Sequence, residues 1–135
     1  MNRTLVICKP DAVERGLVGE ILGRFERKGL RLAAVELRTL DADLLARHYS
    51  EHVGKGFYDD LVAFMGRSPA LAAVVEGPED TWRVVRAMMG ATDPLKAEPG
   101  TIRGDLGTEV TENLVHGSDS AASAQREVSL FFPGL

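Results

Sequence analysis

Three short apolar runs along the chain have the pattern of buried β-strands. They lie at residues 5–8, 32–37 and 71–75, and each is partly β-branched. Runs of this length and composition are typical of strands covered on at least one face. A fourth, shorter strand is expected over residues 113–118, after a loop rich in glycine and proline.

Apolar residues between and after these runs recur at helical spacing. Helices are predicted from Val18 to a stop at Gly29, from an N-cap at Asp41, over residues 60–65, from residues 77–78 to Gly90, and from about Ser120 to the end of the chain. The last helix should turn Ala121, Ala124, Val128 and Phe131 inward. Strands and helices that alternate in this split βαβ order predict an α/β fold, a ferredoxin-like βαββαβ sandwich with an antiparallel sheet covered by helices. The glycine-rich loop and the C-terminal helix are additions to it.

Composition limits the class of protein. A length of 135 residues suits one domain, 1–135, and the net charge of −4 argues against a stable nucleic acid partner. No apolar run approaches the roughly 20 residues that span a bilayer, so no membrane association is expected. The N-terminus lacks the features of a secretion signal, and Cys8 is the only cysteine. Cytoplasmic localisation, with Cys8 as a buried structural thiol, is the expectation.

Candidate chemistry gathers on the predicted strand at 113–118. Alternation along a strand places His116 and Ser118 on one face, and Gly117 removes bulk beside the imidazole. Asp119 can cap the following helix, on which Glu127 could reach back toward His116. A histidine oriented by a hydroxyl and a carboxylate suits nucleophilic or acid–base chemistry. The alternative is a strand histidine that only bonds its neighbours; His48 and His52 lack such surroundings and are interpreted as surface or helix-packing residues.

Basic side chains could supply an anion pocket despite the acidic balance. Lys9 directly follows the first strand, where ligands gather in open α/β sheets, although a solvated lysine beside a capping Asp11 explains it equally well. Arg103 lies among glycines that free the backbone to aim its guanidinium inward, unless it is a loop arginine in water. Arg86 and Thr92 bracket a helix end and could add a guanidinium and a hydroxyl. Together these groups favour phosphoryl transfer.

Two further features are whether the chain itself binds a metal ion and which residues could bind a nucleobase. The chain has neither a Walker loop nor a cysteine/histidine metal cluster, so a metal ion would arrive with nucleotide phosphates. Phe57 and Tyr58 follow the flexible residues 54–56 and could stack on a nucleobase. They could equally be core aromatics at a helix start.

Along nearly its whole length the sequence resembles the nucleoside diphosphate kinase family. Five segments match the family's motifs in order: residues 9–11, 15–20, 48–49, 99–105 and 113–120. The resemblance implies the ferredoxin-like fold and a ping-pong reaction, in which a nucleoside triphosphate phosphorylates His116 and a nucleoside diphosphate removes the group. It also implies low base specificity, Mg²⁺ carried by the nucleotide phosphates, and assembly as a homo-oligomer, for which a hexamer is favoured over a tetramer.

Roles follow by position from the same resemblance. The residues that would contact the phosphates, the ribose or the surroundings of the nucleophile are Lys9, Tyr49, Arg86, Thr92, Arg103 and Asn113. Phe57 would stack on the base with Val110 on its other side, Ser118 and Glu127 would orient His116, and Asp119 could reach the metal ion through water.

Some positions depart from the commonest pattern of the family. Ala12 stands where glycine is frequent, and Lys55-Gly56 replaces a common proline-containing pair, which should loosen the loop before Phe57. Asp93 and Glu112 are also unusual, and the chain stops at Leu135, short of the longer tails that join subunits in many members. A regulatory member with little turnover and a ferredoxin-like RNA-binding module are the rival hypotheses. The acidic charge and the lack of an aromatic-rich strand oppose the RNA-binding module.

Overall fold

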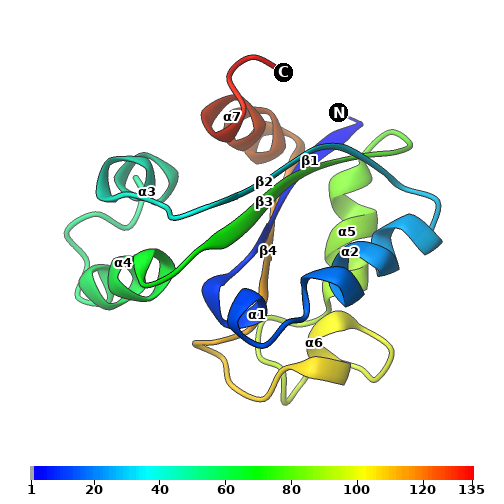
Figure 1. Ribbon diagram of the computed structural model, residues 1–135, viewed down its shortest axis with the longest axis horizontal. Helices are drawn as coiled ribbons and strands as arrows, with labels where there is room; N and C mark the ends of the chain where they lie inside the picture. The colour runs from blue at the N-terminus through cyan, green and yellow to red at the C-terminus, as the bar shows by residue number, and fades with distance from the viewer. Residues whose placement is uncertain (1) are drawn as a thin grey trace.

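The computed structural model describes residues 2–135 as a four-stranded sheet with helices on both faces (Figure 1). The strands are β1 (Arg3–Cys8), β2 (Arg31–Arg38), β3 (Ala70–Glu76) and β4 (Val115–Gly117), and the helices are α1 (Pro10–Glu14), α2 (Val18–Arg27), α3 (Ala42–His48), α4 (Tyr58–Gly66), α5 (Thr81–Met89), α6 (Ile102–Leu106) and α7 (Ala121–Phe131). The sheet order is β2-β3-β1-β4 and every pairing is antiparallel. This arrangement confirms the ferredoxin-like sandwich.

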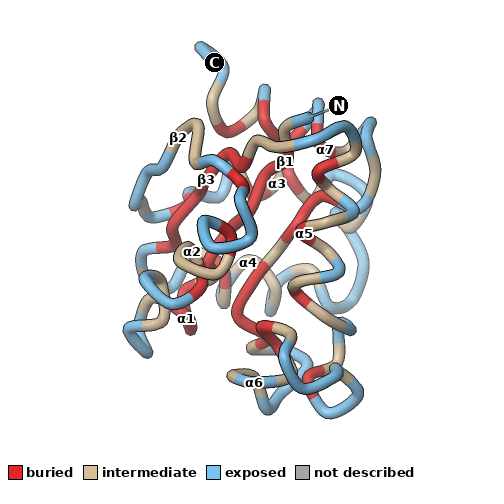
Figure 2. The backbone as a smooth tube through the Cα atoms, turned by 90° about the vertical axis from the view of Figure 1, so that its right-hand side faces the viewer, coloured by how far each residue is buried: buried red, intermediate tan, exposed pale blue. Residues whose placement is uncertain are grey.

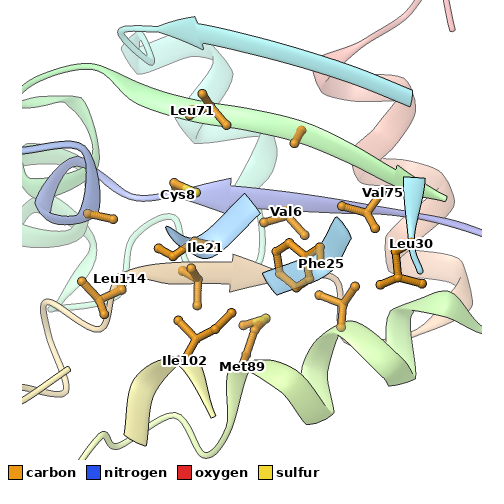
Figure 3. Packing of buried hydrophobic residues seen from close by; sticks show 14 residues of the cluster. Val6, Cys8, Ile21, Phe25, Leu30, Leu71, Val75, Met89, Ile102 and Leu114 are labelled. Atoms are coloured by element: carbon orange, nitrogen blue, oxygen red, sulfur yellow. The ribbon is translucent and has the colours of Figure 1, made fainter. Parts of the chain in front are cut away.

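Two apolar clusters fill the two sides of the sheet. On one side Val6 and Cys8 of β1 pack with Phe25 of α2 and Met89 of α5 (Figure 3). On the other side alternate residues of β1 and β3 pack with α3, α4 and α7. The central strands are therefore buried throughout, as the tube in Figure 2 shows in red. This double burial explains why the strands read as continuous apolar runs rather than alternating ones.

Several predicted helix ends are confirmed by their hydrogen bonds. The Asp41 carboxylate accepts a hydrogen bond from the Leu44 amide at 2.8 Å, and the Ser120 hydroxyl accepts one from the Ser123 amide at 3.0 Å. Gly29 follows α2 with a φ of +95°, the left-handed conformation of a helix stop. The caps fix where α3 and α7 begin, and these two helices carry residues of the site described below.

Several details differ from the sequence-based expectation; the strand predicted over residues 113–118, for example, spans only Val115–Gly117. Helix α5 begins at Thr81 rather than at residues 77–78, because the Gly77 amide still donates to the Asn2 carbonyl at 2.9 Å and Asp80 adopts a left-handed φ of 59°. Helices α1 and α6 were not predicted; each has five residues, too few to show a helical period. Ala121 is exposed in the first turn of α7, whereas Ala124, Val128 and Phe131 face the core as expected.

Within residues 2–135, none of the helices combines the length and apolarity needed to cross a membrane. Cys8 is fully buried, and burial raises the pKa of its thiol to about 12. The prediction of an unreactive structural thiol is consistent with both observations.

Candidate active site

Strand β4 aims the His116 side chain at the face covered by α3 and α7. His116 pairs with Ile7 of β1, which belongs to the cluster on that face. Its neighbour Gly117 faces α5, where an added Cβ would lie 2.6 Å from the Met89 sulfur. Gly117 is therefore required for close packing of α5 against the sheet, not for space beside the imidazole as the sequence suggested.

The imidazole of His116 is held by a buried carboxylate. Its Nε2 lies 2.8 Å from Oε1 of Glu127, and the Ser118 hydroxyl donates to the same oxygen at 2.7 Å. Burial alone would raise the pKa of Glu127, but the hydrogen bonds and charge of His116, together with the Ser118 hydroxyl, lower it below its usual value. Because the ionised carboxylate only accepts, Nε2 donates to it and Nδ1 keeps a free lone pair. The predicted trio of His116, Ser118 and Glu127 is thus brought together.

The segment before His116 is fixed by the first turn after β1. Leu114 is fully buried with a φ of +76°, a conformation that is strained for a branched residue. Its amide donates to the Asp11 carboxylate at 3.1 Å, and its carbonyl accepts from the Lys9 amide at 2.9 Å. Asp11 is therefore neither a helix cap nor a solvated residue; it holds the backbone two residues before the imidazole.

Lys9, Asn113 and Thr92 form a connected polar chain. The Lys9 ammonium donates to Oδ1 of Asn113 at 2.8 Å, and Nδ2 of Asn113 donates to the Thr92 carbonyl at 3.0 Å. Burial, and secondarily the charge of Arg103, lower the pKa of Lys9 to about 8. A solvated lysine is thus excluded, because the side chain is mostly buried and directed at a second predicted site residue.

Arg103 is the most buried cation of the site. Its guanidinium donates to the carbonyls of Asn113, Val115 and Gly90 at 3.1, 2.7 and 3.1 Å, and the residue is only 5% exposed. Burial and the nearby charge of Arg86 lower the pKa of Arg103 to about 10. Three of its five N–H groups are occupied, so the side chain ties β4 to the end of α5 and leaves two donors for an anion.

A small cavity of about 220 Å³ opens in front of His116. His116, Glu127, Arg86, Tyr49 and Asp119 are among its lining residues. The Arg86 guanidinium donates to the Gly117 carbonyl at 3.0 Å, and burial raises the pKa of the Tyr49 phenol. The cavity thus combines the histidine, a guanidinium and a phenol that stays protonated.

A second and larger cavity, of about 710 Å³, brings together the predicted nucleotide-binding residues. Lys9, Thr92, Asn113, Phe57 and Val110 all line it. Phe57 and Val110 are 50% and 54% exposed, which makes them available to a planar ligand. Of the two aromatic residues left open by the sequence, Phe57 is the one in this lining. Arg103 appears in the lining of neither cavity.

Sequence reasoning missed the position of His48. Its ring is 5% exposed, and it packs edge-on against His116 with the ring centroids 4.9 Å apart. Burial, and secondarily the charge of His116, lower the pKa of His48 to about 3, so the ring is neutral. The residue packs within a helix as expected, but its contact with the nucleophile depends on how α3 meets β4. Nothing in the local sequence signals that contact.

The donor set fits a metal ion that is held chiefly by substrate. Arg86 and Lys9, which line the two cavities, are cationic, and the Glu127 carboxylate bonds His116 and Ser118 through Oε1. Glu51 and Asp119 are exposed carboxylates in the lining of the smaller cavity. A hard cation prefers several oxygen ligands, which nucleotide phosphates and water supply.

The sequence and fold match known proteins over nearly the whole chain. The sequence model described as "Nucleoside diphosphate kinase" matches residues 2–135. The nucleoside diphosphate kinase of Streptomyces avermitilis is 59% identical over 134 residues, covering 98% of this chain and 97% of the relative. That of Mycobacterium leprae is 58% identical over 135 residues, covering 99% and 98%.

Solved structures agree with these relatives. The nucleoside diphosphate kinase of Halobacterium salinarum in complex with CDP superposes with a TM-score of 0.92 at 47% identity, covering 96% of this chain and 86% of that one. A Babesia bovis family protein gives a TM-score of 0.94 at 45% identity, covering 98% and 88%. The chain belongs to the nucleoside diphosphate kinase family and transfers the γ-phosphoryl group of a nucleoside triphosphate to a nucleoside diphosphate, a reaction that uses a divalent cation.

Proposed function

We propose that Nδ1 of His116 accepts the γ-phosphoryl group from a nucleoside triphosphate and passes it to a nucleoside diphosphate in a ping-pong cycle. The observation that carries this assignment is the 2.8 Å contact between Nε2 and Glu127. It fixes the tautomer and leaves Nδ1 as the nucleophilic atom. In the phosphohistidine the imidazole gains positive character, which the Glu127 carboxylate offsets.

Cationic side chains around His116 stabilise the transferring group. Arg86 lines the same cavity as the imidazole, Lys9 lines the larger one, and Arg103, bonded to the Asn113 and Val115 carbonyls on either side of Leu114, keeps two N–H donors. Charge on the phosphoryl oxygens grows or shifts in the transition state, and preorganised donors stabilise it without reorganising. Mg²⁺ bound to the nucleotide phosphates would neutralise further charge, with Asp119 within reach of its water shell. Tyr49 and Thr92 contribute hydroxyl groups at the edges of the site.

Low base specificity follows from the character of the larger cavity. Phe57 and Val110 can sandwich a base through its faces, and every base has a π-face. Discrimination between bases needs polar groups that are buried against a base edge. The two half-exposed apolar walls do not supply such groups.

An assembly of dimers, extended to a hexamer rather than a tetramer, is proposed for the quaternary structure. Strand β2 lies at the edge of the sheet, and its residues Val35 and Leu37 are 46% and 58% exposed. An exposed apolar edge strand is a template for pairing with another chain. We further propose that residues 1–135 act as a single catalytic domain in the cytoplasm, where the lone buried Cys8 would stay reduced.

The test of the proposed function is a labelling experiment with γ-labelled ATP and magnesium. The purified protein should acquire acid-labile, base-stable label and then pass it to added GDP. His116→Gln should acquire no label, whereas the matched control His52→Gln should still acquire it. Unlabelled protein that still binds nucleotide would support the regulatory hypothesis instead.

A further inference from the structure

The His48 ring is buried without a polar partner. Among residues 2–135, neither Nδ1 nor Nε2 of His48 has a hydrogen-bond partner, and the residue is 5% exposed. Its ring packs edge-on against Phe131 at 5.2 Å and against His116 at 4.9 Å. Burying an unsatisfied ring nitrogen is unfavourable, and a bound ion would supply the missing partner.

The nearest polar atoms make His48 part of a cluster of three potential ligands. One donor atom each from His48, His116 and Glu127 lie within 4.8 Å of one another, on α3, β4 and α7. Two ligands of a tetrahedral zinc ion lie about 3.4 Å apart, so side-chain movements that together shorten the longest separation by up to about 1.4 Å would close the triad. The small cavity in front of His116 leaves room for a fourth ligand from solvent.

We propose that His48, His116 and Glu127 bind one transition-metal ion of the zinc class, and that the bound ion switches the nucleophile off. Two imidazoles and one carboxylate form a ligand set that suits zinc and its neighbours. Mg²⁺ prefers oxygen ligands, so the cation that accompanies the nucleotide does not compete for this set.

The proton of His116 explains the inhibition. In the metal-free protein, Nε2 carries the proton that it donates to the Glu127 carboxylate. An ion bound between His116 and Glu127 takes the place of that proton and uses the lone pair of Nε2. A neutral imidazole keeps one ring proton, and with Nε2 bound to metal that proton moves through solvent to Nδ1. Nδ1 then has no lone pair with which to attack phosphorus. This consequence rests on the proposed role of His116, whereas metal binding itself does not.

Metal binding is tested on the nucleotide-free protein with Zn²⁺ as the probe, by competition with a chromophoric chelator in the absence of Mg²⁺. One ion should bind per chain, and His48→Gln and Glu127→Gln should each weaken the affinity at least about tenfold. His52→Gln is the matched control, because His52 lines the same cavity outside the triad. An equal loss in His52→Gln, or unchanged binding in His48→Gln and Glu127→Gln, would overturn the assignment.

A spectrum of the wild-type protein tests the same metal site without variants that could misfold. In a long-range proton–nitrogen spectrum, Zn²⁺ should shift the ring nitrogens of His48 and His116, move the His116 proton to Nδ1 and leave His52 unchanged. Shifts confined to His52, or no shifts at all, would contradict the proposal. An excess of Mg²⁺ should not reverse the shifts.

Inhibition is measured separately, as the rate of phosphohistidine formation from excess MgATP with and without Zn²⁺. The wild-type rate should fall at least about tenfold on stoichiometric binding, and the ratio of the two rates should approach one in His48→Gln. A wild-type protein that forms no phosphohistidine even without zinc would defeat the proposed function and leave the metal site standing. A protein that binds zinc at the triad and still forms phosphohistidine at full rate would defeat the switch alone.

Discussion

The reacting end of the site and the base-binding end are built in opposite ways. Glu127 and Ser118 are 5% and 0% exposed; Glu127 bonds the imidazole of His116, and the Ser118 hydroxyl donates to the same carboxylate oxygen. Phe57 and Val110 are half-exposed walls of an open cavity. Chemistry at phosphorus requires a fixed atom and a fixed tautomer, whereas stacking on a base requires only a flat apolar surface. The comparison explains how one enzyme can be strict about the phosphoryl group and tolerant of the base.

The rim of the base-binding end is likewise exposed to solvent. Arg67, after α4, pairs with Glu112 at 3.1 Å and with Glu14 at 2.6 Å, and all three side chains are substantially exposed. Glu112 departs from the commonest family pattern, and its charge is balanced here by Arg67. Exposed pairs of this kind contribute little to stability. The departure therefore alters the rim of the cavity and leaves the nucleophile's surroundings intact.

Replacing the nucleophile should produce the largest effect. His116→Ala is expected to fold normally and to lose transfer by at least about a thousandfold, because no other described histidine has a partner like Glu127. Steady-state transfer from ATP to GDP, with circular dichroism as the control for folding, measures this. Residual activity within about tenfold of wild type would remove His116 from the mechanism.

Removing Arg103 should damage both rate and stability. Arg103→Ala leaves three carbonyls without their donor, each costing about 1–3 kcal/mol, and removes charge from the phosphoryl site. We expect transfer to slow by one to several orders of magnitude and the free energy of unfolding to fall by about 3 kcal/mol. Single-turnover rates and urea unfolding measure the two effects, and Arg103→Lys, which keeps the charge but not the planar fork, should lie between. An unchanged rate in the alanine variant would place Arg103 outside the site.

Substitution at the base-binding end should affect all nucleotides alike. Phe57→Ala is expected to raise KM about tenfold for the diphosphates of adenosine, guanosine, cytidine and uridine, because only stacking is lost. Tyr58→Ala is the matched control, since the neighbouring aromatic is absent from the cavity lining. A loss confined to one base, or a larger effect at Tyr58, would refute the stacking interpretation.

The smallest effect concerns pH. The lowered pKa of Lys9, about 8, means that its positive charge is present at pH 7 and is lost as the pH rises through 8. The value of kcat/KM should therefore fall on the alkaline side with a midpoint near 8, and Lys9→Arg should move that midpoint upward. Identical alkaline limbs in the two proteins would assign the titration to another group.

The sequence predicted the parts of the molecule whose signal is local. Apolar runs marked the three long strands, and Asp41 and Ser120 marked helix starts through their capping side chains. The trio around His116 was predictable because strand alternation relates His116 to Ser118, and Glu127 lies only about two helical turns after the Ser120 cap. The same local signals indicated a helix start at residues 77–78, but the Gly77 amide pairs with the Asn2 carbonyl instead.

What the sequence could not provide depends on contacts between distant segments. The role of Asp11 requires the pairing of its carboxylate with Leu114, and that of Gly117 requires the approach of α5. The contact of His48 with His116 arises from packing between α3, β4 and α7. No residue type or spacing along the chain encodes these contacts by itself.

The most direct test of the account is the identity of the phosphorylated ring nitrogen. The protein with ¹⁵N-labelled histidine rings would be phosphorylated with ATP, and a long-range proton–nitrogen spectrum would be recorded before the group is lost. The account predicts phosphorus on Nδ1 of His116 and a proton retained on Nε2, where Glu127 accepts it. Phosphorus on Nε2 would contradict the claim that Glu127 selects the nucleophilic atom.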